Sequence, residues 1–93
     1  MRTPPCHYCH RDTVKSRPGK QRPQNEYTRD HVVPRVLGGR HDTVPCCLRC
    51  NSVKSDGSYD EFVTFAATLL RGRKVDPREA AIMWRAWQIR ALL

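Results

Sequence analysis

Two pairs of cysteines constrain the fold of this sequence most strongly. Cys6 and Cys9 form one pair and Cys47 and Cys50 the other, each with two residues between its members. This spacing lets a tight turn direct two thiolates at one ion, and two such turns complete the tetrahedron of a structural zinc site. We therefore expect one closed Zn²⁺ site built from all four cysteines, with the long segment between the pairs folded beside it.

Other ligand sets are compatible with the same residues. His7 or His10 could replace a cysteine, and Cys46 could replace Cys47. We favour Cys47 because it keeps the two-residue spacing and leaves Cys46 as a small buried thiol. A redox role for the first pair is the weaker interpretation, since no βαβ pattern surrounds it. Zinc held in this way is structural and by itself indicates no catalysis.

The size of the chain makes such a metal staple useful. The 93 residues predict a single domain, residues 1–93, whose hydrophobic core alone gives little stability. We find no secretory signal and no membrane span. The expected location is therefore intracellular, in the cytoplasm (the host cytoplasm if a virus or mobile element encodes the chain), where cysteines stay reduced.

Net charge indicates the class of partner. The chain carries +8, from 17 Lys and Arg against 9 Asp and Glu. A polyanion such as DNA is the expected partner, because each cation set against a phosphate releases condensed counterions. Residues 11–25 are polar and basic, and we favour an exposed linker over a phosphate-contacting arm for them.

Local patterns predict an α+β fold with short elements in the first half of the chain. Residues 26–33 are rich in β-branched and aromatic side chains and suit a strand that Pro34 ends. Thr43-Val44 suits a second short strand. Residues 47–56 then suit a short helix that Gly57 terminates.

The last third predicts two helices that pack on the preceding core. Ser58 and Glu61 fit a capping box, and an apolar face follows over residues 62–70. Asp76 and Pro77 fit the start of a second helix. We expect residues 1–57 to form the core and residues 58–93 the packing helices. The wide apolar arc of the last helix could alternatively bind a second copy of the chain or a protein partner.

The segment between and beside the cysteine pairs carries a distinctive order of motifs. It contains Asp30-His31-Val32-Val33-Pro34, then Gly38-Gly39, then Cys47-Leu48-Arg49-Cys50-Asn51-Ser52-Val53-Lys54. From Cys6 to Asp56 this arrangement resembles the HNH endonuclease family, in its version with two C-x-x-C pairs. The resemblance implies a small ββα-metal core with a four-cysteine structural zinc site. It also implies a metal-dependent endonuclease that hydrolyses phosphodiester bonds of DNA, by nicking or by double-strand cleavage.

The resemblance assigns roles to three residues. His31 corresponds to the general base, Asp30 to a ligand of the catalytic divalent metal, and Asn51 to a second ligand where many members have histidine. A neutral imidazole accepts a proton near neutral pH, and oxygen ligands suit Mg²⁺, with Mn²⁺ or Ni²⁺ as alternatives. Adjacent residues of a strand point to opposite faces, so Asp30 can hold a metal while His31 faces the attacking water.

One position departs from the family pattern. Asp42 stands where the family commonly has an asparagine that orients the base through its backbone. An ionised carboxylate accepts hydrogen bonds but donates none, so Asp42 could orient His31 differently, bind metal or weaken activity. His41 is an alternative ligand. Basic residues near these motifs are the expected phosphate contacts, namely Arg35, Arg40, Arg49 and Lys54.

Two other functions explain parts of the pattern. A non-catalytic zinc-finger module that binds nucleic acid explains the zinc and the charge, but leaves Asp30, His31 and Asn51 without a role. A protein-interaction adaptor would depend on the zinc fold and the apolar last helix. For a nuclease we expect little sequence preference, since we find no long recognition helix rich in Asn, Gln and Arg to read bases.

Overall fold

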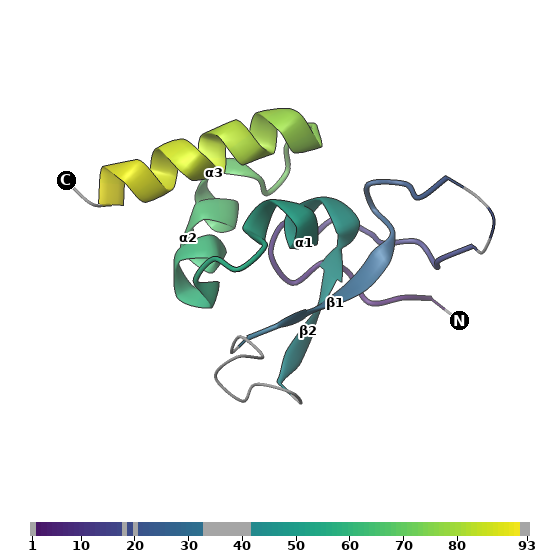
Figure 1. Cartoon of the computed structure of the whole chain (residues 1–93). Coiled ribbons are helices and arrows are strands. Elements are labelled where there is room, and N and C mark those ends of the chain that lie inside the picture. The colour runs from purple at the N-terminus through teal and green to yellow at the C-terminus, as the bar shows by residue number, and fades with distance from the viewer. Residues whose placement is uncertain (1, 18, 20, 33–41, 92–93) are drawn as a thin grey trace.

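The fold is a β-hairpin followed by three helices. It is described here from a computed structural model, in which residues 2–17, 19, 21–32 and 42–91 are described. In chain order the elements are β1 (Tyr27–His31), β2 (Thr43–Cys47), α1 (Leu48–Lys54), α2 (Tyr59–Leu69) and α3 (Pro77–Ala91) (Figure 1).

The two strands pair antiparallel in a register that determines which side chains share a face. Tyr27 lies opposite Cys47 at one end of the hairpin and His31 opposite Thr43 at the other. Strand side chains alternate between faces. Tyr27, Arg29 and His31 therefore lie on one face of β1, and Thr28 and Asp30 on the opposite face.

Helix α1 begins directly after β2, and its first amide groups are capped from outside the helix. Leu48 N donates to Glu26 O at 2.9 Å, Arg49 N donates to Gln24 O at 2.9 Å, and Cys50 N donates to the thiol of the N-cap residue Cys47 at 3.4 Å. These bonds satisfy donors that a helix start leaves without intrahelical partners. They also hold α1 against the entry to β1.

The predicted helix starts in the last third are confirmed. The Ser58 hydroxyl accepts from Glu61 N at the start of α2, and the Asp76 carboxylate accepts from Glu79 N at 2.8 Å before α3. The expected end of α1 at Gly57 is wrong. The helix ends at Lys54 and its C-cap is Ser55, which has a φ of 48°.

Aromatic side chains form the core that joins the N-terminal segment to α2 and α3. Tyr8 contacts Phe62 edge-to-face with ring centroids 4.9 Å apart, and Phe62 contacts Trp84 in the same way at 5.0 Å. The ring centroids of Phe65 and Trp84 are 5.1 Å apart. Such edge-to-face pairs add to the hydrophobic gain of burying the rings. The residues around Cys6 and Cys9 are therefore part of the same core as the two helices.

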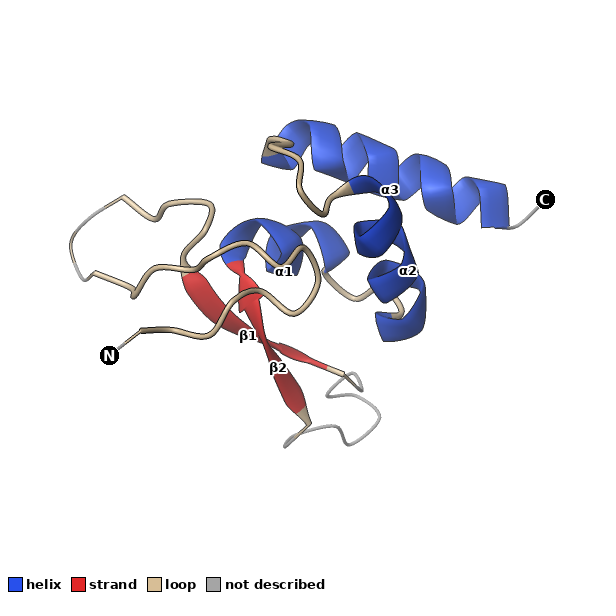
Figure 2. Ribbon diagram, turned by 180° about the vertical axis from the view of Figure 1, so that it is seen from behind, coloured by secondary structure: helices blue, strands red, loops and turns tan. Residues whose placement is uncertain are grey.

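The expected fold class is confirmed, since the chain is a small α+β protein with a two-stranded sheet, three helices and four clustered cysteines. Figure 2 shows the hairpin on one side of α1, with α2 and α3 on the other. Among the described residues no helix is long and apolar enough to cross a bilayer. On α3, Ile82 and Ile89 remain 66% and 55% exposed.

Candidate functional site

The four paired cysteines meet in one buried cluster. The Sγ atoms of Cys6, Cys9, Cys47 and Cys50 all lie within 4.8 Å of one another, and all five cysteines are free thiols. Cys9 Sγ is 3.8 Å from Cys47 Sγ. Tetrahedral coordination with Zn–S bonds of about 2.3 Å places sulfur atoms about 3.8 Å apart. The donor set and its spacing fit a metal ion such as Zn²⁺.

The alternative ligands are used elsewhere. Cys46 is fully buried, its Sγ lies 3.2 Å from Cys47 O, and it is not one of the four clustered ligands. His7 Nε2 lies 2.7 Å from the hydroxyl of Tyr59. His10 is exposed. Among the described residues, the only group of His, Cys, Asp and Glu side chains clustered for a metal is the four cysteines.

The thiols of the cluster shift one another's pKa values. Hydrogen bonds from neighbouring thiols, chiefly from Cys46, lower the pKa of Cys6, and a bond from Cys50 lowers the pKa of Cys47 to about 6. Bonds to Cys47 raise the pKa values of Cys9 and Cys50. Thiols in one buried site cannot all ionise beside each other unless a cation compensates them.

Asp30 points from β1 to the interior and has two donors on one oxygen. Its Oδ2 accepts from the Tyr8 hydroxyl at 2.5 Å and lies 3.0 Å from Lys54 Nζ. Asp30 is 6% exposed and Lys54 4% exposed. Burial, followed by the bond to this carboxylate, raises the pKa of Tyr8, so its hydroxyl stays protonated and donates. The carboxylate is thus a buried, paired anion.

Asn51 lies one helical turn away from this pair. Its Nδ2 donates to Thr28 Oγ1 at 3.1 Å and to Arg29 O at 3.3 Å. Asn51 and Lys54 are three residues apart and share a helix face, and the two strand residues they meet, Thr28 and Asp30, share a strand face. Lys54 pairs directly with Asp30, whereas Asn51 bonds to Thr28 and to the backbone of Arg29.

Asp30 and Asn51 carry oxygen atoms of the kinds that a hard divalent ion prefers, a carboxylate and an amide oxygen. The contacts of Asp30 use Oδ2 and those of Asn51 use Nδ2. The ammonium of Lys54 on the same carboxylate opposes a second cation there.

His31 ends β1 on the opposite face and is partly exposed. Val32 N donates to Asp42 O at 2.8 Å, so Asp42 joins β1 through its backbone next to His31, while its side chain is exposed. A partly exposed imidazole at a strand end can reach a solvent molecule, whereas Asp30 beside it is largely buried and paired with Lys54. The two residues thus have separate environments on one strand.

Two of the predicted phosphate contacts, Arg49 and Lys54, are wrong, because both side chains are buried. Arg49 is 1% exposed, and its guanidinium donates to Val75 O at 2.8 Å and to Cys50 Sγ at 3.7 Å. Lys54 is paired with Asp30. A buried, bonded cation presents no surface to a phosphate, so both serve the interior. Arg35, Arg40 and the alternative ligand His41 lie outside the described residues.

Two residues near the site were missed from the sequence. Tyr8 lies between the first two cysteines and reaches Asp30. Arg29 is exposed on the His31 face, where its Nε donates to Thr43 Oγ1 at 2.7 Å and its Nη1 to the Tyr27 hydroxyl at 2.9 Å. Strand alternation, which puts positions 29 and 31 on one face, was the signal that could have identified Arg29.

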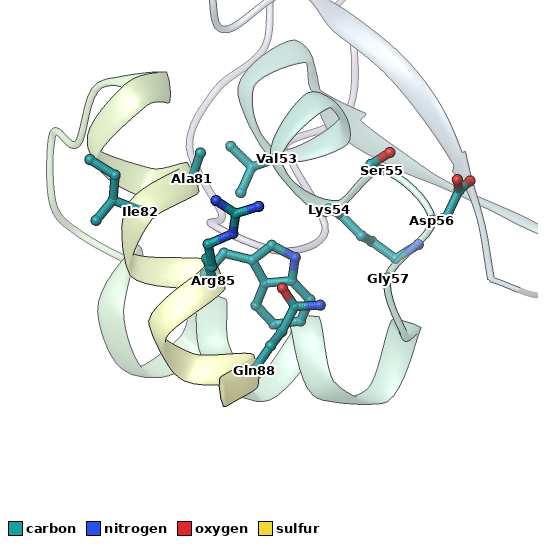
Figure 3. Close-up of a pocket in the computed structure, with 10 residues that line it drawn as sticks. Val53, Lys54, Ser55, Asp56, Gly57, Ala81, Ile82, Arg85 and Gln88 are labelled. Atoms are coloured by element: carbon teal, nitrogen blue, oxygen red, sulfur yellow. The ribbon is translucent and has the colours of Figure 1, made fainter. Parts of the chain in front are cut away.

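A separate groove lies between the turn after α1 and helix α3. It measures about 550 Å³, and in Figure 3 Arg85 extends from α3 toward Val53, while Ser55, Asp56 and Gly57 lie on the opposite side of the groove. Lys54 also lines it, but directs its ammonium to Asp30. Among the described residues, Lys54 is the only one of the expected site residues that lines this groove.

Comparisons with known proteins agree with the sequence motifs. A sequence model described as HNH endonuclease matches residues 18–64, which include β1, β2, α1 and the first half of α2. Neither the comparison with curated proteins nor that with solved structures finds a match.

Proposed function

Since the chain belongs to the HNH endonuclease family, we propose that it is a metal-dependent endonuclease that hydrolyses phosphodiester bonds of DNA. The observation that carries the proposal is the division of β1 between two environments. Asp30 faces the interior beside α1, while His31 lies partly exposed on the other face with the cation of Arg29. A buried anion and an accessible base on adjacent residues suit a metal-assisted hydrolysis.

In this proposal His31 is the general base. Its imidazole accepts a proton from the water that attacks phosphorus, a role to which histidine side chains are suited. Arg29, held by Thr43 and Tyr27, presents its guanidinium on the same face and binds a phosphate oxygen. Asp42 supports the strand end that carries the base, through its backbone bond to Val32.

The proposed metals have separate tasks. Zn²⁺ held by the four cysteines fixes the turn at residues 6–9 against the start of α1. Asp30 and Asn51 would hold Mg²⁺, Mn²⁺ or Ni²⁺, which supplies positive charge against the negative charge that develops on the phosphate and leaving oxygen. Lys54 holds the Asp30 carboxylate in place.

One observation favours the alternative, a zinc-finger module that binds nucleic acid without cutting it. Lys54 already neutralises Asp30 in the interior, and a fully paired carboxylate binds a further cation less readily. In this alternative the ion pair is purely structural, and the basic surface alone provides function.

Plasmid cleavage separates the two functions. Purified, zinc-loaded protein is incubated with supercoiled plasmid and with Mg²⁺, Mn²⁺ or Ni²⁺, and the same preparation is assayed for DNA binding by gel shift. Metal-dependent nicked or linear product is the expected result. If the protein binds DNA but forms no product with any of the three metals, the endonuclease proposal is wrong and the non-catalytic zinc-finger module is the function that remains.

The remaining proposals concern setting and assembly. We place the protein inside the cell, where its five free thiols stay reduced. A homodimer or a protein partner, if one is used, would bind the apolar side chains that α3 exposes, Ile82 and Ile89. Pairing of two copies would convert single-strand nicking to cleavage of both strands.

A further inference from the structure

A cationic pocket lies beside the cysteine cluster, with Cys9 in its wall. It has a volume of about 490 Å³ and is formed where residues 9–11 meet the segment 70–74 that follows α2. Among the described residues, no Asp or Glu lines it. Its cationic lining consists of Arg11, Arg71, Arg73 and Lys74, with the imidazole of His10 beside them.

The pocket is built by backbone contacts and is not a chance gathering of mobile side chains. His10 adopts a φ of 65°, and its amide donates to Cys6 O at 2.9 Å in the turn that carries the first two cysteines. Arg71 Nε donates to Tyr8 O at 3.1 Å, which joins the end of α2 to that turn. Gly72 has a φ of 71°, a conformation that turns the chain after α2.

Arg11 supplies an independent sign of a missing acceptor. Its Nε and Nη2 are buried and have no hydrogen-bond partner within the part of the chain that the structure describes. A guanidinium group has only donors, and buried donors without acceptors are rare and call for an unseen ion or water. Arg11 therefore adds to the pocket wall a guanidinium group whose buried donors have no acceptor among the described residues.

The negative charge of a zinc–thiolate site does not account for all the cations that line the pocket. A zinc ion with four thiolates has a net charge of roughly −2. Arg49, which donates to Cys50 Sγ, and Arg11, beside Cys9 in the pocket wall, offset this charge. The cations of Arg71, Arg73 and Lys74 remain as a surplus that attracts an external anion.

We propose that this pocket binds a backbone phosphate of DNA away from the bond that is cut. Its wall includes Cys9, which lies in the cysteine cluster at the Cys47 end of the hairpin, whereas His31 lies at the other end. The strand between these ends spans about 13 Å, which corresponds to about four base pairs of duplex at 3.4 Å each. The inference adds a flanking contact to the proposed function and depends on the protein acting on DNA.

The salt dependence of DNA binding tests the pocket. Fluorescence anisotropy with a labelled duplex, at several salt concentrations and without added divalent metal, compares Arg73→Gln/Lys74→Gln with Arg78→Gln/Arg90→Gln. Both pairs remove two exposed cations, but only the first pair lines the pocket. Because one phosphate contact is lost, we expect the pocket pair to lower the slope of log K against log salt by about 1 and to weaken binding at least tenfold.

An equal slope change in both pairs, or none in the pocket pair, overturns the inference. An NMR shift of Arg73 Nε with inorganic phosphate, but no effect on DNA binding, would assign the pocket to a free anion and also overturn it. The wild-type cleavage assay is separate. If the wild type cuts DNA but the Arg73→Gln/Lys74→Gln variant binds DNA normally, only the pocket inference is wrong. If that variant binds DNA more weakly but the wild type does not cut, only the nuclease proposal is wrong.

Discussion

Asp30 is the residue at which three parts of the molecule meet. Asp30 lies on β1. Its carboxylate accepts a hydrogen bond from the hydroxyl of Tyr8, which lies in the turn between the first two cysteines, and pairs with Lys54 of α1. A buried carboxylate is tolerated only with such partners. The contacts that stabilise the interior therefore also fix the residue proposed to hold the catalytic metal.

Tyr8→Phe tests the contact from the cysteine turn. The change removes one hydroxyl and leaves the buried carboxylate with one donor fewer, so we expect the free energy of unfolding to fall by about 1.5–3 kcal/mol. Urea denaturation measures it. Tyr27→Phe, which removes a hydroxyl from the exposed face, is the control and should change stability by less than about 0.5 kcal/mol. Equal losses in the two variants would contradict the role of Tyr8.

Lys54→Met tests whether the interior ion pair is required. An uncompensated carboxylate is left behind, and we expect a loss of about 3–5 kcal/mol in unfolding free energy. Adding Asp30→Asn removes that charge, so the double variant should be more stable than the sum of the two single losses predicts. Additive losses in this double-mutant cycle would show that Lys54 and Asp30 act independently.

Among the elements, the turn from Lys54 to Gly57 determines how α3 lies against α1. Gly57 N donates to Lys54 O at 2.8 Å, and Ser55 takes the positive φ of this turn. A Cβ at Gly57 would stand 2.8 Å from the ring of Trp84 and 2.9 Å from Lys54 O. Glycine is therefore needed at position 57 for the close approach of α3, and not for its backbone angle.

Two substitutions in this turn should have opposite effects. Ser55→Gly relieves an unfavourable backbone angle and should raise the free energy of unfolding by about 1 kcal/mol. Gly57→Ala should lower it by about 1–3 kcal/mol, because Trp84 and the backbone must shift. Thermal or urea denaturation of both variants checks the signs. Stabilisation by Gly57→Ala would contradict the packing of α3 on this turn.

For the whole molecule, the cysteine cluster joins the N-terminal turn, β2 and α1. Because binding energy at a structural zinc site is folding energy, Cys50→Ser should lose zinc and most helical circular dichroism. Cys46→Ala, at a buried thiol outside the cluster, should keep one zinc per chain and its fold. Zinc content and circular dichroism of both variants test this. A folded, zinc-free Cys50→Ser protein would exclude the structural metal.

Features with local causes could be predicted from the sequence. The spacing of the cysteine pairs, the caps at Ser58 and Asp76, and the two short strands depend on neighbouring residues, and the structure shows them. The order of motifs between the cysteine pairs likewise indicated the family.

Features that depend on distant partners could not be predicted. Arg49 and Lys54 look like solvated helix residues in the sequence, and only the fold brings Val75 and Asp30 to them. The helix phase that places Asn51 opposite Thr28 is set by where α1 begins after β2. The end of α1 at Ser55 was missed because serine seldom takes a positive φ.

The central claim, that His31 is the base of a nuclease, is tested most directly by single-turnover cleavage of plasmid DNA by His31→Ala. Zinc content and circular dichroism should match the wild type, since the side chain is partly exposed. We predict that DNA binding is retained and that the cleavage rate falls by about 10²–10⁴-fold. Cleavage at the wild-type rate by the folded variant would contradict the account.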